Sequence, residues 1–257
     1  IGYRTIQIWE ETKFIINFIG ECSVLLFISF RNPKKIKWLE VVKIAEHAGV
    51  NALSIIVLIG FLLGLIMSFQ SAIPMQRFGA EIFVANLVSM SLFRELGPLM
   101  TAVIIAGRTA SSFAAELGTM KVSEEIDAIT TMGLSPLRFL VIPRLIAGII
   151  ISPMLTVFFN LAGLLGSAVV MMSFQYPFIT FVNQVLSAVK NVDMLGGLFK
   201  ATVFGGVISA IGCFYGLNTS TGARSVGEST TKSVVNGIIS IAILDGFFSV
   251  LFYYLGL

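Results

Sequence analysis

Long runs without a formal charge divide the chain into segments that can cross a membrane. Thirty such residues separate Glu46 from Arg77, and twenty-three separate Lys200 from Arg224. A helix of about 20 apolar residues crosses the hydrocarbon core of a bilayer. Each run therefore predicts one span, the first over about residues 52–71.

A third run, of 45 residues between Arg144 and Lys190, is too long for one span. As a helix it would measure about 68 Å, more than twice the thickness of the hydrocarbon core. The sequence Gln175-Tyr176-Pro177 supplies the break. We expect a span near residues 145–171, then a short amphipathic helix over residues 178–190 on the outer surface, either a connector or a seat for an external partner.

Two further apolar segments bring the prediction to five spans. Residues 233–257 are apolar apart from Asp245, and residues 82–118 are apolar but carry four charged side chains. In residues 5–30, polar side chains recur at helical spacing, which is typical of a helix in the cytoplasmic interface. A sixth span is the alternative, but it would place Glu21 near mid-membrane at a cost of about 2.5–3.5 kcal/mol.

The predicted fold class is thus an all-α membrane protein: five transmembrane helices, an N-terminal interfacial helix and one short helix outside the membrane on each side. We divide the chain into an N-terminal interfacial region, residues 1–46, and a transmembrane domain, residues 47–257. With these spans, twelve Lys and Arg residues fall on the N-terminal side of the membrane and three fall on the other side. The positive-inside rule then puts the N-terminus in the cytoplasm and the C-terminus outside.

Composition narrows the class of protein further. Of the 257 residues, 56% are hydrophobic and 12% are charged, with a mean hydropathy of +0.93. Soluble domains carry about 25% charged residues. This excludes a disordered chain, a nucleic-acid binder and an ordinary cytosolic enzyme, and it leaves an integral membrane protein.

The isolated polar residues of the other segments are expected to have structural roles only. Cys22 and Cys213 lie in apolar stretches and are expected to be buried thiols, and His47 is expected at the surface. Asp245 is expected to hydrogen-bond to a neighbouring serine or to backbone. No His, Cys or carboxylate cluster has metal-ligand spacing, so no metal site is predicted.

The charged side chains of residues 82–118 are the most informative. On an ideal helical wheel, Arg94, Thr101 and Arg108 fall within about 40° of one another, together with Ser112. Such a polar stripe must face protein or a water-filled cavity rather than lipid. The stripe is either a network that locks helices together or part of a polar substrate path or gate.

Neighbouring side chains on this helix need partners from elsewhere. Arg94 and Glu95 point about 100° apart, so they cannot pair well with each other. Lys200 and Asp193 are the expected partners on another helix. Pro98 removes the backbone bond to residue 94, which predicts a bend.

Small residues predict close helix contacts. Gly60 with Gly64, and Gly212 with Gly216, form two GxxxG pairs that let backbones approach. We include Gly97 and Pro98 with them as helix-packing positions. Either GxxxG pair could also mark a seam between two copies of the chain.

Residues 121–136 predict a short capped helix between the second and third spans. Ser123 is the expected N-cap, Glu124 and Glu125 favour the positive end of the helix dipole, and Gly133 is the expected C-cap. The helix should be about nine residues long and carries Asp127 as a third acid. It is either a docking element or a plain surface turn.

Catalytic and nucleotide-binding chemistry is not predicted on this chain. His47 is its one histidine, so no Ser/His/Asp set can form. Residues 227–233 mimic a P-loop but have Thr231 where the second glycine belongs. We therefore predict that this chain binds no cofactor and is not an enzyme. Any ATP and Mg²⁺ are expected to bind a partner.

An ordered set of motifs resembles the MlaE/YrbE family of ABC-transporter permeases. The likeness is dense from about residue 91 to 144 and looser from residue 48 to the C-terminus. The motifs are Ser91-Leu-Phe-Arg94-Glu95-Leu-Gly97-Pro98, Ala106-Gly107-Arg108, Ala115-Glu116-Leu-Gly118-Thr-Met120, Glu124-Glu125-Ile-Asp127-Ala and Pro143-Arg144.

This resemblance implies the multi-pass core of a lipid transporter in the inner membrane of a Gram-negative-type cell. In the family, two permease copies enclose a lipid-binding cavity, and two ATPase subunits dock on cytoplasmic coupling helices. A ring of MCE-domain proteins sits on the periplasmic side, and a STAS-domain protein can join the ATPase. The implied substrates are phospholipids moved between inner and outer membranes.

Particular residues acquire roles through the same resemblance. It implies a coupling helix that includes Ser123, Glu124, Glu125 and Asp127. Arg94, Glu95 and Lys200 match polar positions near the cavity, and we add Thr101 and Arg108 to the expected substrate path. The chain departs from the family at Thr109-Ala110, where a glycine-containing pair is usual, at Glu125, where Gln is common, and at Ser135, where Asp is common.

Two other classes of function stay open from the residues alone. A stand-alone ion- or proton-coupled secondary transporter or channel would use Arg94, Glu95 and Asp245 as its path. A structural anchor for envelope complexes would need neither a substrate path nor a motor.

Overall fold

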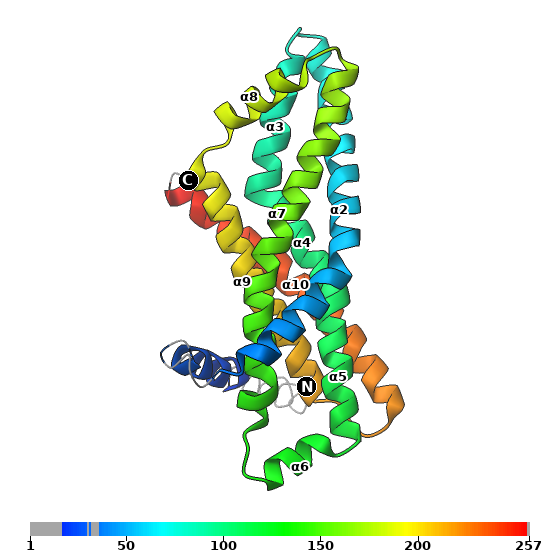
Figure 1. The fold of residues 1–257 in the computed structure, drawn as a ribbon, viewed down its shortest axis with the longest axis vertical. Helices are drawn as coiled ribbons and strands as arrows, with labels where there is room; N and C mark the ends of the chain where they lie inside the picture. Colours follow the sequence, from blue (N-terminus) through cyan, green and yellow to red (C-terminus); the bar gives the residue numbers. More distant parts are fainter. Residues whose placement is uncertain (1–16, 30, 32–35, 256–257) are drawn as a thin grey trace, which may run out of the picture.

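A computed structural model describes residues 17–29, 31 and 36–255 of the chain, and every regular element in these residues is helical. Five helices are long and apolar enough to cross a membrane, which confirms the predicted number (Figure 1). They are α2 (Trp38–Gln76), a helix over Glu81–Val122, a helix over Leu137–Ser173, α9 (Asn191–Leu217) and α10 (Ala223–Leu255).

Two of these long helices are composite. The helix over Glu81–Val122 consists of η2 (Glu81–Phe83), α3 (Val84–Ser91), η3 (Leu92–Leu96), α4 (Gly97–Ile105), η4 (Ala106–Ala110) and α5 (Ser111–Val122). The helix over Leu137–Ser173 consists of η5 (Leu137–Val141) and α7 (Ile142–Ser173). Short helices α6 (Glu125–Thr131) and α8 (Phe178–Ala188) lie towards opposite ends of the bundle (Figure 1).

The segments η3, η4 and η5 are π-helical turns. In η3, the Gly97 amide bonds to the Leu92 carbonyl, five residues back, and Pro98 starts the ordinary helix α4. A π turn takes in an extra residue and rotates everything that follows it around the helix axis. The wheel used for residues 94–112 assumed 3.6 residues per turn throughout, and the structure gives its residues different surroundings: Thr101 is fully buried, whereas Arg108 is exposed.

Glycines bring the long helices together. Gly60 and Gly64 on α2 lie against the backbone of Phe159 and Gly163 on α7, where an added Cβ would collide. Gly212 and Gly216 on α9 lie in the same way against η4 and α5. Both GxxxG pairs are therefore occupied inside one chain, and neither marks a seam between two copies.

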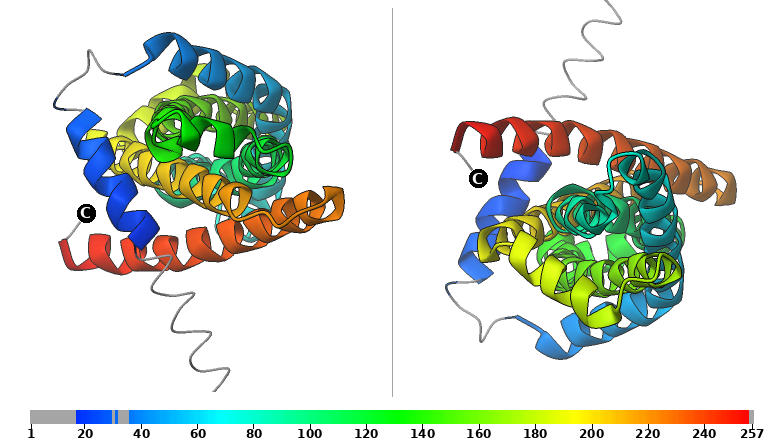
Figure 2. Two further views of the ribbon diagram at one scale, coloured as in Figure 1. Left: turned by 90° about the horizontal axis from the view of Figure 1, so that it is seen from below. Right: turned by 90° about the horizontal axis from the view of Figure 1, so that it is seen from above.

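A helix over Asn17–Ser29 lies across the long helices rather than along them (Figures 1 and 2). Its 13 residues measure about 20 Å, which is too short to cross a bilayer core. Phe18 packs edge-on against Phe214 of α9, with 5.2 Å between ring centroids, and Cys22 is buried. Cys213 is also buried, so both thiols are placed as predicted. The predicted helix over residues 5–30 extends into residues 1–16 and 30, which lie outside the described residues, as do Lys34 and Lys35.

The short helix α8 follows its prediction in position but only partly in its packing. Phe181 and Val185 are buried, as its expected apolar face requires. Phe178 and Leu186 belong to the same predicted face but are 49% and 72% exposed. Part of the apolar face of α8 is therefore open at this end of the bundle.

Candidate functional site

A buried ammonium group ties three long helices together. Lys200 of α9 is fully buried, and its Nζ lies 2.6 Å from Oε2 of Glu95 on η3 and 3.3 Å from Oδ1 of Asp245 on α10. The Ser249 hydroxyl donates to the other oxygen of Glu95 over 3.3 Å. Asp245 thus bonds to Lys200 and not, as expected, to a serine or to backbone. The physical reason is that two carboxylates compensate a cation that has lost all its water.

Arg94 forms a second ion pair beside this cluster. Its Nη1 lies 3.2 Å from Oδ1 of Asp193, in the first turn of α9. Asp193 also accepts a hydrogen bond from the backbone N–H of Lys190, over 3.1 Å, and so caps the helix. Arg94 and Glu95 therefore diverge to separate partners on α9, as their spacing predicted.

These two ion pairs differ in exposure. The Lys200 side chain is fully buried, whereas the Arg94 side chain is one-third exposed. Arg94 lines a cavity of about 300 Å³ together with Asp193, Phe199 and Phe252. In this arrangement an anionic ligand can approach Arg94, while Lys200 holds the position of Glu95.

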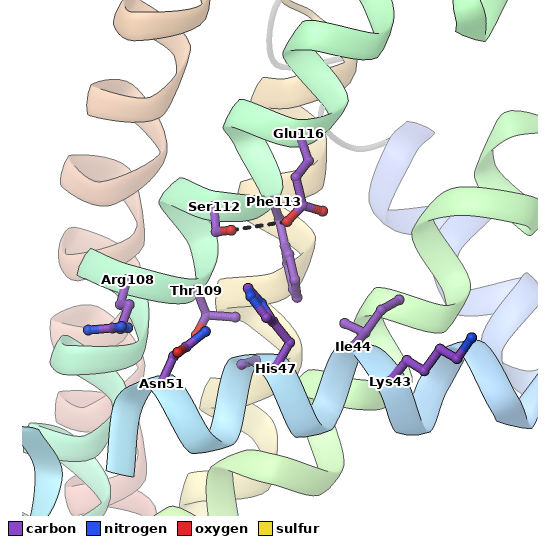
Figure 3. Close-up of a pocket in the computed structure, with 10 residues that line it drawn as sticks. Lys43, Ile44, His47, Asn51, Arg108, Thr109, Ser112, Phe113 and Glu116 are labelled. Carbon is purple, nitrogen blue, oxygen red and sulfur yellow. Dashed lines mark hydrogen bonds between the residues drawn. The ribbon is translucent and has the colours of Figure 1, made fainter. Parts of the chain in front are cut away.

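The other two residues of the expected substrate path do not join this site. Thr101 is fully buried, and its hydroxyl has no hydrogen-bond partner among the described residues. Arg108 on η4 lines a different cavity, of about 460 Å³, between α2 and α5 (Figure 3). The structure thus joins Glu95 to Lys200 and Arg94 to Asp193, whereas Thr101 and Arg108 form no ion pair or side-chain hydrogen bond with these residues.

This second cavity contains residues that the sequence analysis missed. Lys43, His47 and Asn51 line its α2 side, and Ser112 and Glu116 lie on α5 opposite (Figure 3). The spacing of four residues along α2 was a usable signal, since it places these three side chains on one face. Their partner helix is some sixty residues away in sequence, which no local pattern reveals.

A further ion pair compensates the carboxylate of Glu116 in the second cavity. Arg144 of α7 donates from Nη2 to Oε2 of Glu116 over 3.0 Å and from Nη1 to the Leu140 carbonyl over 2.9 Å. The Ser112 hydroxyl also donates to Glu116, over 3.1 Å. The carboxylate of Glu116 is therefore already compensated.

The α6 region presents an acidic surface at the end of the bundle. Ser123, Glu124, Glu125 and Asp127 are exposed, while Ile126 on the opposite side of α6 is buried against the bundle. Lys121 lies 2.7 Å from Asp127. Two large apolar side chains just beyond α6, Met132 and Leu134, are 67% and 45% exposed. Both acidic and apolar contacts are thus available to a partner.

The caps of α6 were predicted only in part. Ser123 is not the N-cap: its hydroxyl donates to the Thr119 carbonyl and to the Glu125 carboxylate, each over 3.0 Å. Glu124 occupies the N-cap position with a left-handed φ of 62°, and α6 has seven residues instead of nine. The C-cap is Met132 instead of the expected Gly133, which follows it in the left-handed region with a φ of 77°. The amides of Gly133 and Leu134 bond back into α6, so this glycine ends the helix from the position after the C-cap.

The P-loop-like residues 227–233 lie inside the continuous helix α10. A P-loop needs backbone N–H groups that are free to surround a phosphate. Inside a helix these groups bond to carbonyls of the preceding turn. This segment therefore does not form a P-loop.

Five long apolar helices with ion pairs buried between them define a multi-pass membrane protein. The family model described as Permease MlaE matches residues 41–251, and the chain belongs to this family. It is therefore the permease type of subunit found in ABC transporters.

Individual relatives cover most of the chain. A probable ABC transporter permease protein of Rickettsia bellii is 35% identical over 255 residues, 98% of this chain and 96% of the relative. Another from Rickettsia prowazekii is 37% identical over 206 residues, 80% of each chain. The intermembrane phospholipid transport system permease protein MlaE of Haemophilus influenzae is 31% identical over 240 residues, 91% of this chain and 92% of the relative.

Proposed function

We propose that this chain is the permease subunit of an ABC transporter that moves phospholipids between the inner and outer membranes. The observation that carries the proposal is Arg94, a partly exposed cation at the wall of an apolar cavity, held in place by Asp193. A guanidinium group binds phosphate oxygens well, and apolar walls suit acyl chains. The Haemophilus relative is a permease of an intermembrane phospholipid transport system, which supports the same substrate class.

Within this site, Arg94 and Lys200 have different proposed roles. Arg94 contacts the lipid phosphate, in competition with its bond to Asp193. Lys200 is a positioning residue, because it is fully buried and bonded to Glu95 and Asp245. Thr101 is fully buried and does not line the cavity beside Arg94.

The α6 end of the bundle is proposed to face the cytoplasm. Among the described Lys and Arg residues that lie near the ends of the spans or in the connections between them, most are at this end of the bundle. Arg77 and Lys190 lie towards the α8 end. The helix over Asn17–Ser29 then lies in the cytoplasmic interface of the inner membrane, as its direction and length allow (Figure 1).

This orientation assigns partners to the two ends. The exposed acids of α6 form the coupling surface for a separate ATPase that holds ATP and Mg²⁺. Glu124 supports this role, since a non-glycine residue in the left-handed region costs about 1–3 kcal/mol and such strain gathers at functional sites. The open apolar side chains of α8 receive a periplasmic MCE-domain protein. A STAS-domain protein joins the ATPase on the cytoplasmic side.

A second copy of the chain completes the proposed transporter. One side of α10 is exposed and apolar, including Ile243, Phe247 and Val250. This side contacts the second copy in the proposed homodimer. Asp245 lies on the opposite face of α10, about 200° around the helix from Ile243, where it bonds to Lys200. The lipid path would then run between the two copies.

Transport in vesicles tests the substrate site. The chain, reconstituted with its ATPase and a fluorescent phospholipid, should move lipid only with ATP. Arg94→Gln should lower the rate about tenfold, the value of one charge-assisted contact, and Arg94→Lys should lower it less. Arg138→Gln, at an exposed arginine away from this cavity, is the matched control. Gradient-driven transport by the chain alone would instead support the secondary-transporter alternative and contradict the proposal.

Co-purification tests the coupling surface. Replacing both Glu125 and Asp127 with Lys should release the ATPase from the permease, because it reverses the charge of α6. Glu228→Lys makes the same kind of change at an exposed position on α10 and should leave the complex intact. Equal loss of the ATPase from both variants would argue against α6 as the docking element.

A further inference from the structure

We propose that the cavity between α2 and η4–α5 binds the phosphate group of a phospholipid head, at a site separate from Arg94. The cavity measures about 460 Å³, within the range of small-ligand sites. Lys43, His47 and Asn51 line one side and Arg108 lines the other (Figure 3). This site goes beyond the proposed function, since it neither contains Arg94 nor depends on the ATPase.

The cavity carries uncompensated positive charge. Its one acid, Glu116, bonds to Arg144 of α7 and to Ser112, so its charge is used. Neither Lys43 nor Arg108 forms an ion pair with any residue that the structure describes. Glu46 lines an adjoining hollow with Lys43, but it does not line this cavity. An anion is therefore the ligand that the charges favour.

The donors present suit a phosphate oxygen cluster. The Arg108 guanidinium offers a planar fork of N–H donors. The Lys43 ammonium lies at the other end of the cavity from Arg108 (Figure 3), so it attracts an anion at longer range and does not share the contact. The Asn51 amide and Thr109 hydroxyl, which also line the cavity, can donate further hydrogen bonds. Arg108 and Asn51 lie along the same gap between η4 and α2 in Figure 3.

The level of the cavity in the bundle favours a lipid rather than free phosphate. Glu116 of this cavity bonds to Arg144 of α7. The next residue of α7, Leu145, lines another cavity together with Phe18 and Cys22 of the helix over Asn17–Ser29. The cavity thus lies at the level of a helix that is too short to span and suited to the interface. Phe113 and Ile44 add apolar wall, against which the start of an acyl chain can lie.

Position along the helix separates the two sites. Arg94 and Arg108 are fourteen residues apart on one continuous helix, which corresponds to about 21 Å. This is about two-thirds of the hydrocarbon thickness. A head at Arg108 and a head at Arg94 would therefore belong to lipids at different depths, so the same helix would hold two separate head-group sites.

Photo-crosslinking can test this site directly. The full chain, with a benzophenone amino acid in place of Ala48 of the cavity wall, would be placed in phosphatidylcholine nanodiscs with trace radiolabelled phosphatidylglycerol. We expect crosslinking of the labelled lipid, and about tenfold less in the Lys43→Gln/Arg108→Gln double variant. Arg108→Lys should retain most of the signal, and Arg138→Gln, an exposed arginine outside the cavity, should retain all of it.

Three results would overturn the proposal. The first is an equal yield from the double variant, and the second is an equal yield from radiolabelled diacylglycerol, which lacks the phosphate. The third is loss of the signal on adding glycerol phosphate, which would identify a site for soluble anions. Size-exclusion profiles check folding, and Lys43→Gln alone gives a second reading at an exposed position.

A second probe separates this inference from the proposed function. The same benzophenone group in place of Phe199 reports on the cavity beside Arg94. The Lys43→Gln/Arg108→Gln variant should leave that crosslink unchanged, and Arg94→Gln should leave the Ala48 crosslink unchanged. Either proposal can therefore fail while the other stands.

Discussion

Two π turns on the same long helix carry arginines in opposite surroundings. At η3, Arg94 and the adjacent Glu95 both bond to side chains of α9, and Lys200 is fully buried. At η4, Arg108 is exposed beside a cavity, with no ion pair to any residue of the described ranges. A π turn thus carries an ion-paired arginine at η3 and, at η4, an arginine without an ion pair among the described residues.

The neighbouring helices explain this difference. Gly197 lies against the Phe93 carbonyl, so α9 can approach η3 closely enough for Lys200 and Asp193 to reach it. At η4, Gly212 of α9 packs on Ala110, on a different side of the helix from the cavity. Across that cavity, α2 offers Lys43, His47 and Asn51 and no carboxylate partner for Arg108. The charge is therefore compensated at η3 but available at η4.

Removing Lys200 should destabilise the protein more than any other change considered for these two sites. Lys200→Ala leaves Glu95 and Asp245 without their shared cation. Breaking a buried ion pair on one side costs about 3–5 kcal/mol. We expect a much lower midpoint of thermal unfolding in detergent, together with weaker expression.

The matched change at the open site should cost little. Arg108→Ala removes no ion pair, so its effect should stay within about 0.5 kcal/mol, as for other exposed positions. A triple variant, Lys200→Met with Glu95→Gln and Asp245→Asn, should recover much of the stability lost in Lys200→Ala. Equal destabilisation by Arg108→Ala and Lys200→Ala would show that the two sites do not differ as described.

Glycines at the two π turns give a medium-sized test. A Cβ at Gly97 would collide with the Asn160 amide oxygen and the Leu92 carbonyl, whereas a Cβ at Gly107 would meet nothing within 4 Å. Overpacking costs about 1–3 kcal/mol, so Gly97→Ala should lower the unfolding midpoint. Gly107→Ala should be neutral or stabilising by up to about 1 kcal/mol, since alanine favours the helix. The opposite order of the two midpoints would refute the close packing at η3.

Much of the architecture could be predicted because charges and chain length constrain it. The 45-residue uncharged run had to turn, and the structure turns it at residues 174–177. Arg94 and Glu95 had to find partners on other helices, since adjacent residues diverge, and they did so on Lys200 and Asp193.

The failures have a common physical cause. A π turn leaves no simple mark in the sequence, and a wheel of constant pitch did not show that Thr101 is fully buried while Arg108 is exposed. The cavity around His47 needs α2 and α5, far apart in sequence, to meet. Ser123 failed as an N-cap because its hydroxyl bonds back to α5 instead. Local patterns predict elements well, but they do not predict what faces them.

Thiol labelling can compare the exposure of positions 112 and 101 with little disturbance of the structure. Ser112→Cys places a thiol on the wall of the open cavity, and Thr101→Cys places one at a fully buried position on the same helix. A water-soluble maleimide should modify the first variant within minutes and the second hardly at all. The native background is low at neutral pH, because burial, with a smaller contribution from Glu21, raises the pKa of Cys22 to about 11. Cys22 should therefore stay protonated, and its labelling should rise only as the pH approaches 11. Equal labelling of the two variants would mean that water reaches position 101 as readily as the cavity wall, and the difference in burial between the two positions would be wrong.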